Sequence, residues 1–162
     1  MTNVCVIGLG NWGKKVLNSI KKIKKINSIQ IVKNRRDKTK VNFNKLNWVF
    51  VTTPTYNHYS TVKKYLKKKI NVFCEKPLTL DEAKAKELLN ISKKKGVKMY
   101  IDDIEKYKKK NLKISNVKNY ILRTKKDKGS SLSLLNRLAY HDLYLLNDFI
   151  LNKNIRKINT SI

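Results

Sequence analysis

The apolar residues of this chain form two alternating patterns, namely short uninterrupted runs and longer stretches in which apolar positions recur every three or four residues. A short run bounded by turn residues predicts a buried strand, and the longer recurrence predicts an amphipathic helix. The predicted strands lie at residues 3–8, 29–33, 46–52, 70–74 and 97–101, and the predicted helices at residues 12–25, 57–68 and 79–96. Such alternation is typical of an α/β fold with a doubly wound parallel sheet, in which ligands bind at the carboxyl ends of the strands.

The last of these helices carries signals at both of its ends. Thr79 followed by Glu82 matches a capping box, in which each side chain bonds the backbone N–H of the other residue. Gly96 matches the glycine that commonly ends a helix. We therefore expect Thr79 to cap this helix.

The pattern changes after residue 108. Residues 117–123 and 155–161 predict strands, and residues 138–151 predict an amphipathic helix. We expect two domains, an α/β domain over residues 1–108 and a small α+β part over residues 109–162.

The first predicted strand runs directly into a G-x-G-x-x-G motif formed by Gly8, Gly10 and Gly13. In a dinucleotide-binding turn the first glycine allows the tight turn, the second lets the backbone approach a pyrophosphate, and the third lets the helix pack closely on the strand. The phosphates would then lie at the helix N-terminus, next to Asn11 and Trp12. Because only five glycines occur in 162 residues, three in this register favour a Rossmann nucleotide site over an ordinary strand–helix turn.

The end of the second predicted strand bears on the choice of cofactor. An NAD enzyme places an acidic residue on the ribose hydroxyls about 20 residues after the last glycine. This chain has Lys33 there, followed by Asn34, Arg35 and Arg36, and Asp37 stands four residues late. A basic cluster at this point fits a 2′-phosphate and favours NADP over NAD, with the general basicity of the chain as the competing explanation.

The chain is strongly basic, with 38 Lys and Arg against 11 Asp and Glu and a net charge of +27. Such a charge usually suggests a nucleic-acid partner. However, only five of the basic residues are Arg, the residue that phosphate and base recognition enriches, and the lysines are scattered. We therefore expect no specific nucleic-acid partner and only weak, salt-sensitive binding to polyanions.

No apolar stretch reaches the length of a membrane span, and the N-terminal apolar run is too short for a signal peptide. We therefore expect a cytoplasmic protein without a membrane partner. Cys5 and Cys74 fall within predicted strands, so we expect buried reduced thiols and no metal site.

Two further peptides stand where predicted strands end, Thr52-Thr-Pro-Thr-Tyr-Asn-His58 and Glu75-Lys-Pro77. Together with the glycine motif they resemble the Gfo/Idh/MocA family of NAD(P)-dependent dehydrogenases, which includes glucose-fructose oxidoreductase and inositol dehydrogenase, over about residues 2–108. The resemblance implies that Lys76 is the catalytic lysine, which hydrogen-bonds the reacting hydroxyl or carbonyl oxygen beside the nicotinamide. It also implies that the other motif residues line the cofactor cleft, namely Thr52, Thr53, Pro54, His58, Glu75 and Pro77.

The region after residue 108 departs from the family. His141, in the predicted helix, matches the family's catalytic histidine and would act as general acid and base. Many members carry an Asp four residues earlier, where this chain has Arg137. The family's second domain is also larger, so the resemblance implies a truncated substrate and oligomerisation domain over residues 109–162 and fits a homo-oligomer that completes the substrate pocket.

Two functions remain open at this point. The first is an NAD(P)-dependent oxidoreductase that transfers a hydride between nicotinamide and a sugar, a sugar nucleotide or a cyclic polyol. The second is a nucleotide-binding or partner module without turnover. The short second domain, Arg137, and the pair Asp102-Asp103, where the family tends to have small or histidine residues, support the second.

Overall fold

The structure is a computed structural model that describes residues 1–34 and 36–103. The chain divides into two compact units, Met1–Asp102 and Asp103–Ile162, and the described helices and strands all belong to the first. The elements predicted after residue 108 and the predicted domain boundary lie outside the described residues, so they stay predictions.

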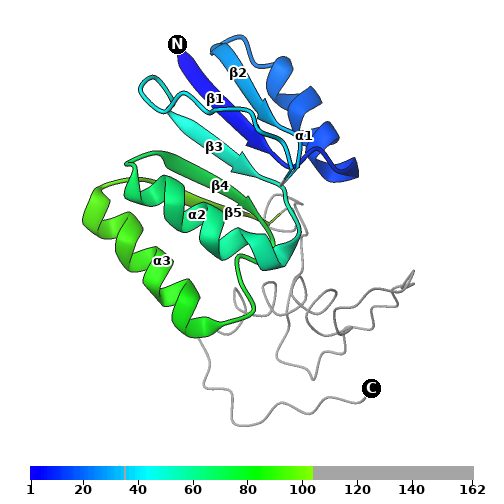
Figure 1. Cartoon of the computed structure of the whole chain (residues 1–162). Coiled ribbons are helices and arrows are strands. Elements are labelled where there is room, and N and C mark those ends of the chain that lie inside the picture. Colours follow the sequence, from blue (N-terminus) through cyan, green and yellow to red (C-terminus); the bar gives the residue numbers. More distant parts are fainter. Residues whose placement is uncertain (35, 104–162) are drawn as a thin grey trace, which may run out of the picture. The chain divides into compact units, whose positions relative to one another are not determined.

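Five parallel strands form one sheet in the order β2-β1-β3-β4-β5 (Figure 1). The strands are β1 (Thr2–Ile7), β2 (Ile26–Val32), β3 (Trp48–Val51), β4 (Asn71–Glu75) and β5 (Met99–Asp102). The helices are α1 (Asn11–Lys21), α2 (His58–Lys67) and α3 (Glu82–Lys95), and a short 3-10 helix η1 (Thr55–Asn57) precedes α2. The predicted five strands, three helices and Rossmann-type α/β fold are confirmed.

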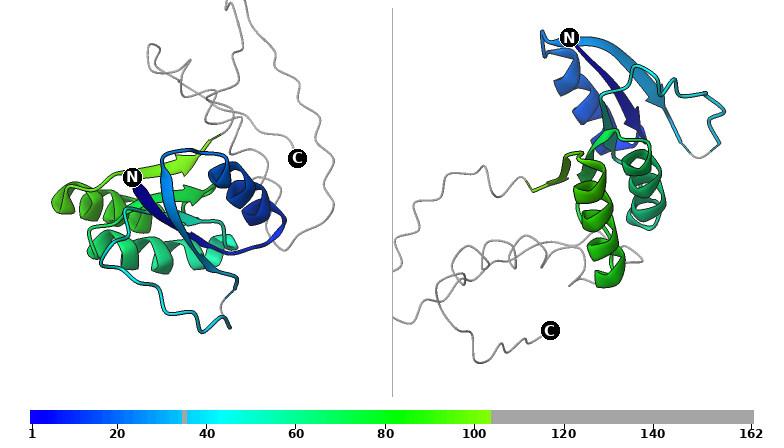
Figure 2. Two further views of the ribbon diagram at one scale, coloured as in Figure 1. Left: turned by 90° about the horizontal axis from the view of Figure 1, so that it is seen from above. Right: turned by 90° about the vertical axis from the view of Figure 1, so that its left-hand side faces the viewer.

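The helices cover the sheet from two sides, as the views in Figure 2 show. Alternate residues of β1 point to opposite faces. Val4 and Val6 pack in one cluster with Leu17 and Ile20 of α1, whereas Cys5 belongs to a second cluster with buried residues of α2 and α3. The strands in the middle of the sheet are therefore apolar on both faces, as parallel sheets require.

The boundary between α1 and β2 differs from the prediction. The helix ends at Lys21, not at residue 25, and β2 starts at Ile26, not at residue 29. Asn27 and Ser28 extend the strand because both donate hydrogen bonds to the side chain of Asn3 on β1, at 2.9 and 2.8 Å. These polar residues broke the apolar run, so periodicity alone did not assign them to the strand.

The expected capping box of α3 is wrong. Asp81 is the N-cap, and its carboxylate accepts a hydrogen bond of 3.1 Å from the Lys84 N–H. Thr79 Oγ1 accepts from the Asp81 N–H at 3.2 Å and so fixes the turn that precedes the cap. The expected end is confirmed, since Gly96 terminates the helix in the left-handed conformation with φ of 64°.

A side chain of β2 holds the connection between β2 and β3. The carboxamide of Gln30 donates to the Asn42 carbonyl oxygen at 3.0 Å and accepts from the Asn42 N–H at 2.8 Å. One side chain thereby makes the pair of hydrogen bonds that a neighbouring strand would make, and it holds the segment that connects β2 to β3 against the sheet.

Candidate functional site

The glycine motif forms a tight turn between β1 and α1. Gly8 has φ of +95°, and a Cβ there would lie 2.9 Å from the Thr52 carbonyl group. A Cβ on Gly13 would lie 1.9 Å from the Gly8 oxygen, so only glycine lets α1 pack this closely on the turn. Thr52 Oγ1 donates to the same oxygen at 2.6 Å and holds the turn against β3.

Gly10 has a different role, because its backbone is ordinary and a Cβ there would meet nothing within 4 Å. The space above it opens at the N-terminus of α1, where the N–H groups of Asn11 and Trp12 have no partner within the helix. An anion bound there would meet these N–H groups and the positive end of the helix dipole. The residues present therefore fit a pyrophosphate.

The two family-like peptides are joined by a buried histidine. The His58 side chain is 1% exposed, its Nδ1 lies 2.8 Å from the Pro77 oxygen, and its Nε2 lies 2.7 Å from the Thr53 oxygen. The imidazole thus ties the loop after β3 to the loop after β4. Pro54 precedes η1, and the peptide bond between Lys76 and Pro77 is cis. His58 therefore has a definite structural contact as well as a place beside the predicted cleft.

Lys76 follows β4 directly and stands next to the carboxyl group of Glu75. Glu75 ends β4 and pairs in register with Asp102 at the end of β5. Burial and the hydrogen-bonding carboxyl of Asp102 raise the pKa of Glu75 well above its ordinary value, and the charge of Lys76 opposes this rise. The indole Nε1 of Trp12, from the first turn of α1, donates to Asp102 Oδ2 at 3.3 Å. The first turn of α1 is thereby in contact with the end of β5, the strand beside Glu75.

The end of β2 carries an acidic group that the sequence spacing missed. The chain turns back after Asn34, so that Asp37 Oδ2 accepts a 2.7 Å hydrogen bond from the Lys33 N–H. Asp37 Oδ1 accepts from the backbone N–H and the hydroxyl of Thr39. These hydrogen bonds lower the pKa of Asp37 to about 2. Arg35 lies outside the described residues. The signal for this turn was the Asp-x-Thr sequence, because Asp side chains often bond the backbone two residues on.

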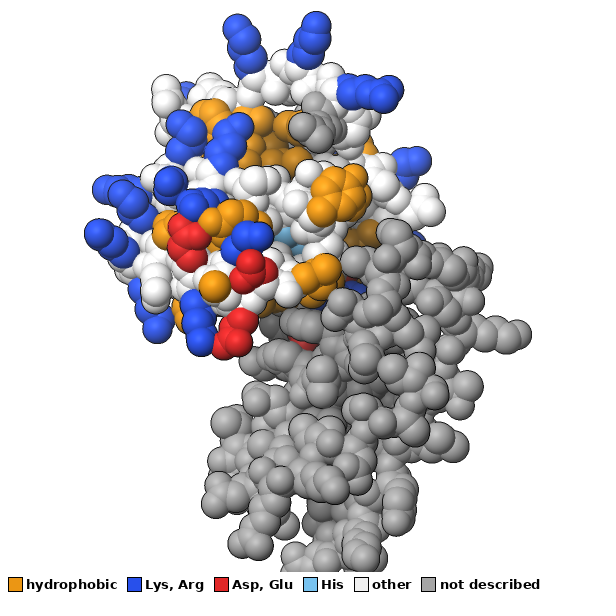
Figure 3. Space-filling model, turned by 60° about the horizontal axis from the view of Figure 1, so that its bottom comes forward, with side chains coloured by type: hydrophobic (Ala, Val, Ile, Leu, Met, Phe, Trp, Pro, Cys, Tyr) orange, Lys and Arg blue, Asp and Glu red, His pale blue; other side chains and the backbone are white. Residues whose placement is uncertain are grey.

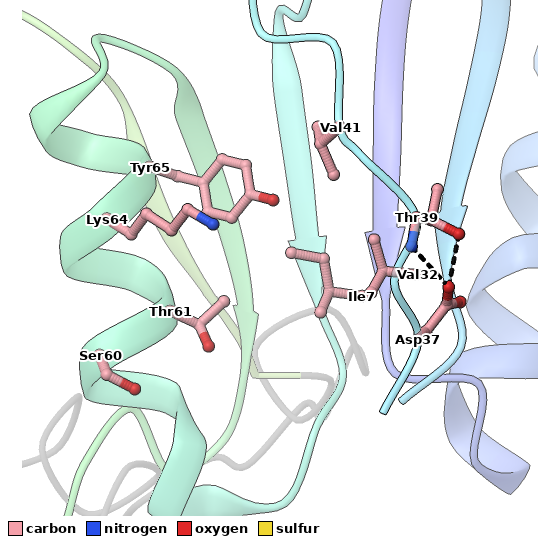
Figure 4. Close-up of a pocket in the computed structure, with 9 residues that line it drawn as sticks. All are labelled: Ile7, Val32, Asp37, Thr39, Val41, Ser60, Thr61, Lys64 and Tyr65. Atoms are coloured by element: carbon pink, nitrogen blue, oxygen red, sulfur yellow. Dashed lines mark hydrogen bonds between the residues drawn. The ribbon is translucent and has the colours of Figure 1, made fainter. Parts of the chain in front are cut away.

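A pocket of about 350 Å³ lies between the end of β2 and α2 (Figure 4). One wall comes from α2 and the other from the ends of β1 and β2 and the loop after β2; the lining residues are Ile7, Val32, Asp37, Thr39, Val41, Ser60, Thr61, Lys64 and Tyr65. Its size and its mixture of apolar side chains with hydroxyls and one charge of each sign are typical of small-molecule sites.

The remaining predictions concern thiols, metals and membranes. Cys5 and Cys74 are buried free thiols, as expected, and burial raises the pKa of Cys5 to about 11. Within residues 1–34 and 36–103, no group of His, Cys, Asp and Glu could hold a metal ion, and no helix is long and apolar enough to cross a membrane. His141 and Arg137 lie outside the described residues, so the expected role of His141 stays a prediction.

Comparison with known proteins points to one family. Residues 38–102 match the family model GFO_IDH_MocA, described as an oxidoreductase family with an NAD-binding Rossmann fold. None of the curated proteins is similar enough in sequence to count as a match.

Many solved structures share the fold. An oxidoreductase from Bacillus cereus is 23% identical, with a TM-score of 0.59 over 66% of this chain and 36% of that one. A biliverdin reductase from Synechocystis, solved with biliverdin and NADP+, is 16% identical, with a TM-score of 0.55 over 64% of this chain and 38% of that one. A UDP-N-acetylglucosamine 3-dehydrogenase from Acidithiobacillus ferrooxidans is 17% identical, with a TM-score of 0.54 over 64% and 37%. The chain spans little more than a third of the length of these structures, and identities this low show the fold alone.

Proposed function

We propose that this chain, whose residues 38–102 match the NAD-binding Rossmann fold of the Gfo/Idh/MocA oxidoreductase family, binds NAD(P) along the carboxyl edge of its sheet. The observation that supports this most is the glycine turn, in which Gly8 and Gly13 admit no side chain while the space above Gly10 is open. The strand order supports it too, because the order reverses between β1 and β3, the point at which doubly wound sheets bind ligands.

The orientation of the cofactor follows from the sheet. A dinucleotide that crosses this point puts one half over the β2 side and the other over the β3–β5 side. The pocket between β2 and α2 suits the adenosine half, since it offers apolar walls and hydroxyl groups. The nicotinamide half would then lie over β4 and β5, near Lys76 and Asp102.

We propose NADP as the better cofactor. The Asp37 carboxylate already accepts hydrogen bonds from Lys33 and Thr39, so the chain's own backbone holds it. Lys33, Arg36 and the pocket residue Lys64 leave cationic groups for a 2′-phosphate. Asp37 at the end of β2 is the feature that would instead favour the ribose hydroxyls of NAD.

The reaction proposed is hydride transfer to or from a sugar, a sugar nucleotide or a cyclic polyol. When bound, the nicotinamide supplies the hydride acceptor or donor. Lys76 would hold the substrate oxygen and stabilise the negative charge that develops on it. His141, in a part of the chain that the structure does not describe, would exchange the proton. The protein would thus act on a sugar-like small molecule, in the cytoplasm, and as a homo-oligomer.

Titration of the full chain with NADPH and NADH by calorimetry tests the cofactor site. A polyanion competitor and moderate salt remove nonspecific attraction to the lysines. We expect one saturable site with tighter NADPH binding. Gly10→Val should abolish this binding, because the valine side chain would fill the pyrophosphate space. If the unmodified chain binds neither cofactor, the proposal is refuted.

Turnover tests the role of Lys76. With NADP+ and a panel of sugars, sugar nucleotides and polyols, we expect Lys76→Ala to keep cofactor affinity and to lose turnover, while Lys94→Ala on the exposed side of α3 keeps both. The second candidate function is nucleotide binding without turnover, favoured by the carboxyl group of Asp102 beside Glu75, the residue that precedes Lys76. Cofactor binding with no turnover across the whole panel would support it.

A further inference from the structure

The hydride transfer proposed above gives no chemical step to the carboxyl pair formed by Glu75 and Asp102. The two residues lie side by side at the carboxyl ends of β4 and β5. Two ionised carboxylates on neighbouring strand ends repel each other, and neither can donate a hydrogen bond to the other. A single proton between them removes the repulsion and supplies the hydrogen-bond donor.

The surroundings of Glu75 also favour the protonated form of its carboxyl group. Its Oε2 is enclosed and meets no hydrogen-bond donor within the described part of the chain. The Asp102 carboxyl lies within hydrogen-bonding reach but donates only when it is protonated. Within the described residues, three groups face the pair: the Trp12 indole N–H from α1, the Lys76 cation and the buried Cys74 thiol on β4. The Trp12 hydrogen bond and the Lys76 charge both favour the ionised form of Glu75. For Glu75, this cation and this donor do not outweigh the effects of burial and of the neighbouring Asp102 carboxyl.

We propose that Glu75 and Asp102 hold one proton between them at neutral pH, and that this proton leaves when the cationic ring of the oxidised cofactor binds but stays when the neutral ring of the reduced cofactor binds. This inference rests on the proposed function, because it needs the nicotinamide over β4 and β5. The ring of NADP+ carries a positive charge that NADPH lacks, whereas their phosphates are the same. Comparing the two cofactors therefore isolates the effect of the ring charge on the pair.

The consequence is a coupling between proton and redox state. A positive charge close to a carboxyl group in a partly screened site lowers its pKa by about one unit or more. Near the midpoint of the pair, that change releases about 0.4 proton more with NADP+ than with NADPH. By linkage, the affinity for NADP+ relative to NADPH rises with pH, by up to about tenfold across the transition.

The first measurement needs no cofactor. In the full chain labelled with ¹³C at the side-chain carboxyls, we expect one carboxyl to titrate about 2 pH units or more above the usual Glu range. Asp102→Asn should return it toward that range, because the Asn amide donates to Glu75 without carrying a charge. If every carboxyl titrates below about pH 6, the shared proton does not exist and the proposal fails.

The second measurement is calorimetric titration with NADP+ and with NADPH in phosphate and in Tris buffer, whose difference in ionisation enthalpy counts the protons released. We expect greater release with NADP+, and no difference between the cofactors in Asp102→Asn or Glu75→Gln. Glu82→Gln removes one exposed carboxylate from α3 and should behave like the unmodified chain. Equal release with both cofactors overturns the inference but leaves the proposed function intact, whereas no binding of either cofactor overturns both.

Discussion

At the scale of single residues, the three glycines of the turn have separable roles. Gly13 meets the Gly8 oxygen so closely that a Cβ there would overlap it at 1.9 Å, whereas a Cβ on Gly10 would meet nothing. One glycine therefore serves the packing of α1, and the other leaves room for a ligand. The sequence motif assigned these separate roles, and the structure shows the close contact at Gly13 and the open space at Gly10.

Alanine substitutions distinguish the two roles. We expect Gly13→Ala to lower the free energy of unfolding by about 3 kcal/mol, because the new Cβ would overlap the Gly8 backbone oxygen and force α1 away from the turn. Gly10→Ala should leave the stability nearly unchanged and weaken NADPH binding. Urea unfolding together with calorimetric titration measures both, and an equally stable Gly13→Ala variant would contradict the packing argument.

At the scale of elements, short polar signals set the boundaries of the helices and loops. Thr79 and Glu82 matched a capping box, yet Asp81 between them caps α3 because its carboxylate reaches the Lys84 N–H. Asp37 likewise returns to the end of β2 through a turn that a count of residues cannot follow. Such errors arise because several Ser, Thr and Asp near one helix start compete for the same N–H groups, and their spacing does not tell which wins.

The cap of α3 can be tested directly. We expect Asp81→Ala to lower the free energy of unfolding by about 1 kcal/mol, because a helix N–H loses its acceptor. Glu82→Gln should change it by no more than about 0.3 kcal/mol, since that carboxylate is exposed and forms an exposed ion pair with Lys86. Urea unfolding measures both changes. A larger loss of stability for Glu82→Gln than for Asp81→Ala would support the capping box of Thr79 and Glu82 instead.

The hydrogen bonds that Asp37 accepts in the loop after β2 should persist at low pH. The pKa of Asp37 is lowered to about 2, so the carboxylate keeps its hydrogen bonds at and above the ordinary Asp pKa and loses them only as the pH falls through about 2. We expect the amide NMR signals of Lys33 and Thr39 to stay in place from pH 7 to about 3. The Lys98 amide, which donates to the uncharged Asn71 side chain, is the control. Movement of the Lys33 and Thr39 signals near pH 4 would contradict the lowered pKa.

At the scale of the whole molecule, the alternation of apolar runs and periodic stretches predicted the sheet and its helices, because strands buried on both faces leave a clear pattern. The pattern could not predict contacts between distant segments, such as the Trp12 indole on Asp102 or the His58 ring between two loops. These contacts depend on how the turns bring the carboxyl ends of β3, β4 and β5 together, which no local pattern records.

The positive charge is a property of the whole molecule and not of one site. On the face shown in Figure 3, the Lys and Arg side chains are spread over the surface and do not form one compact patch. With a net charge of +27, we expect weak binding to a polyanion such as heparin at low salt that is lost by about 0.3 M salt. NADPH binding should persist there, as fluorescence titration can show. Polyanion binding that survives this salt would instead indicate a specific nucleic-acid site.

The side-chain amide of Gln30 has a consequence for the connection between β2 and β3. A loop that is fixed at a point along its length can move only as two shorter loops. Gln30 bonds both the N–H and the carbonyl oxygen of Asn42 and fixes the connection at that residue. One glutamine thus restricts the motion of the segment that contributes Asp37, Thr39 and Val41 to the pocket wall.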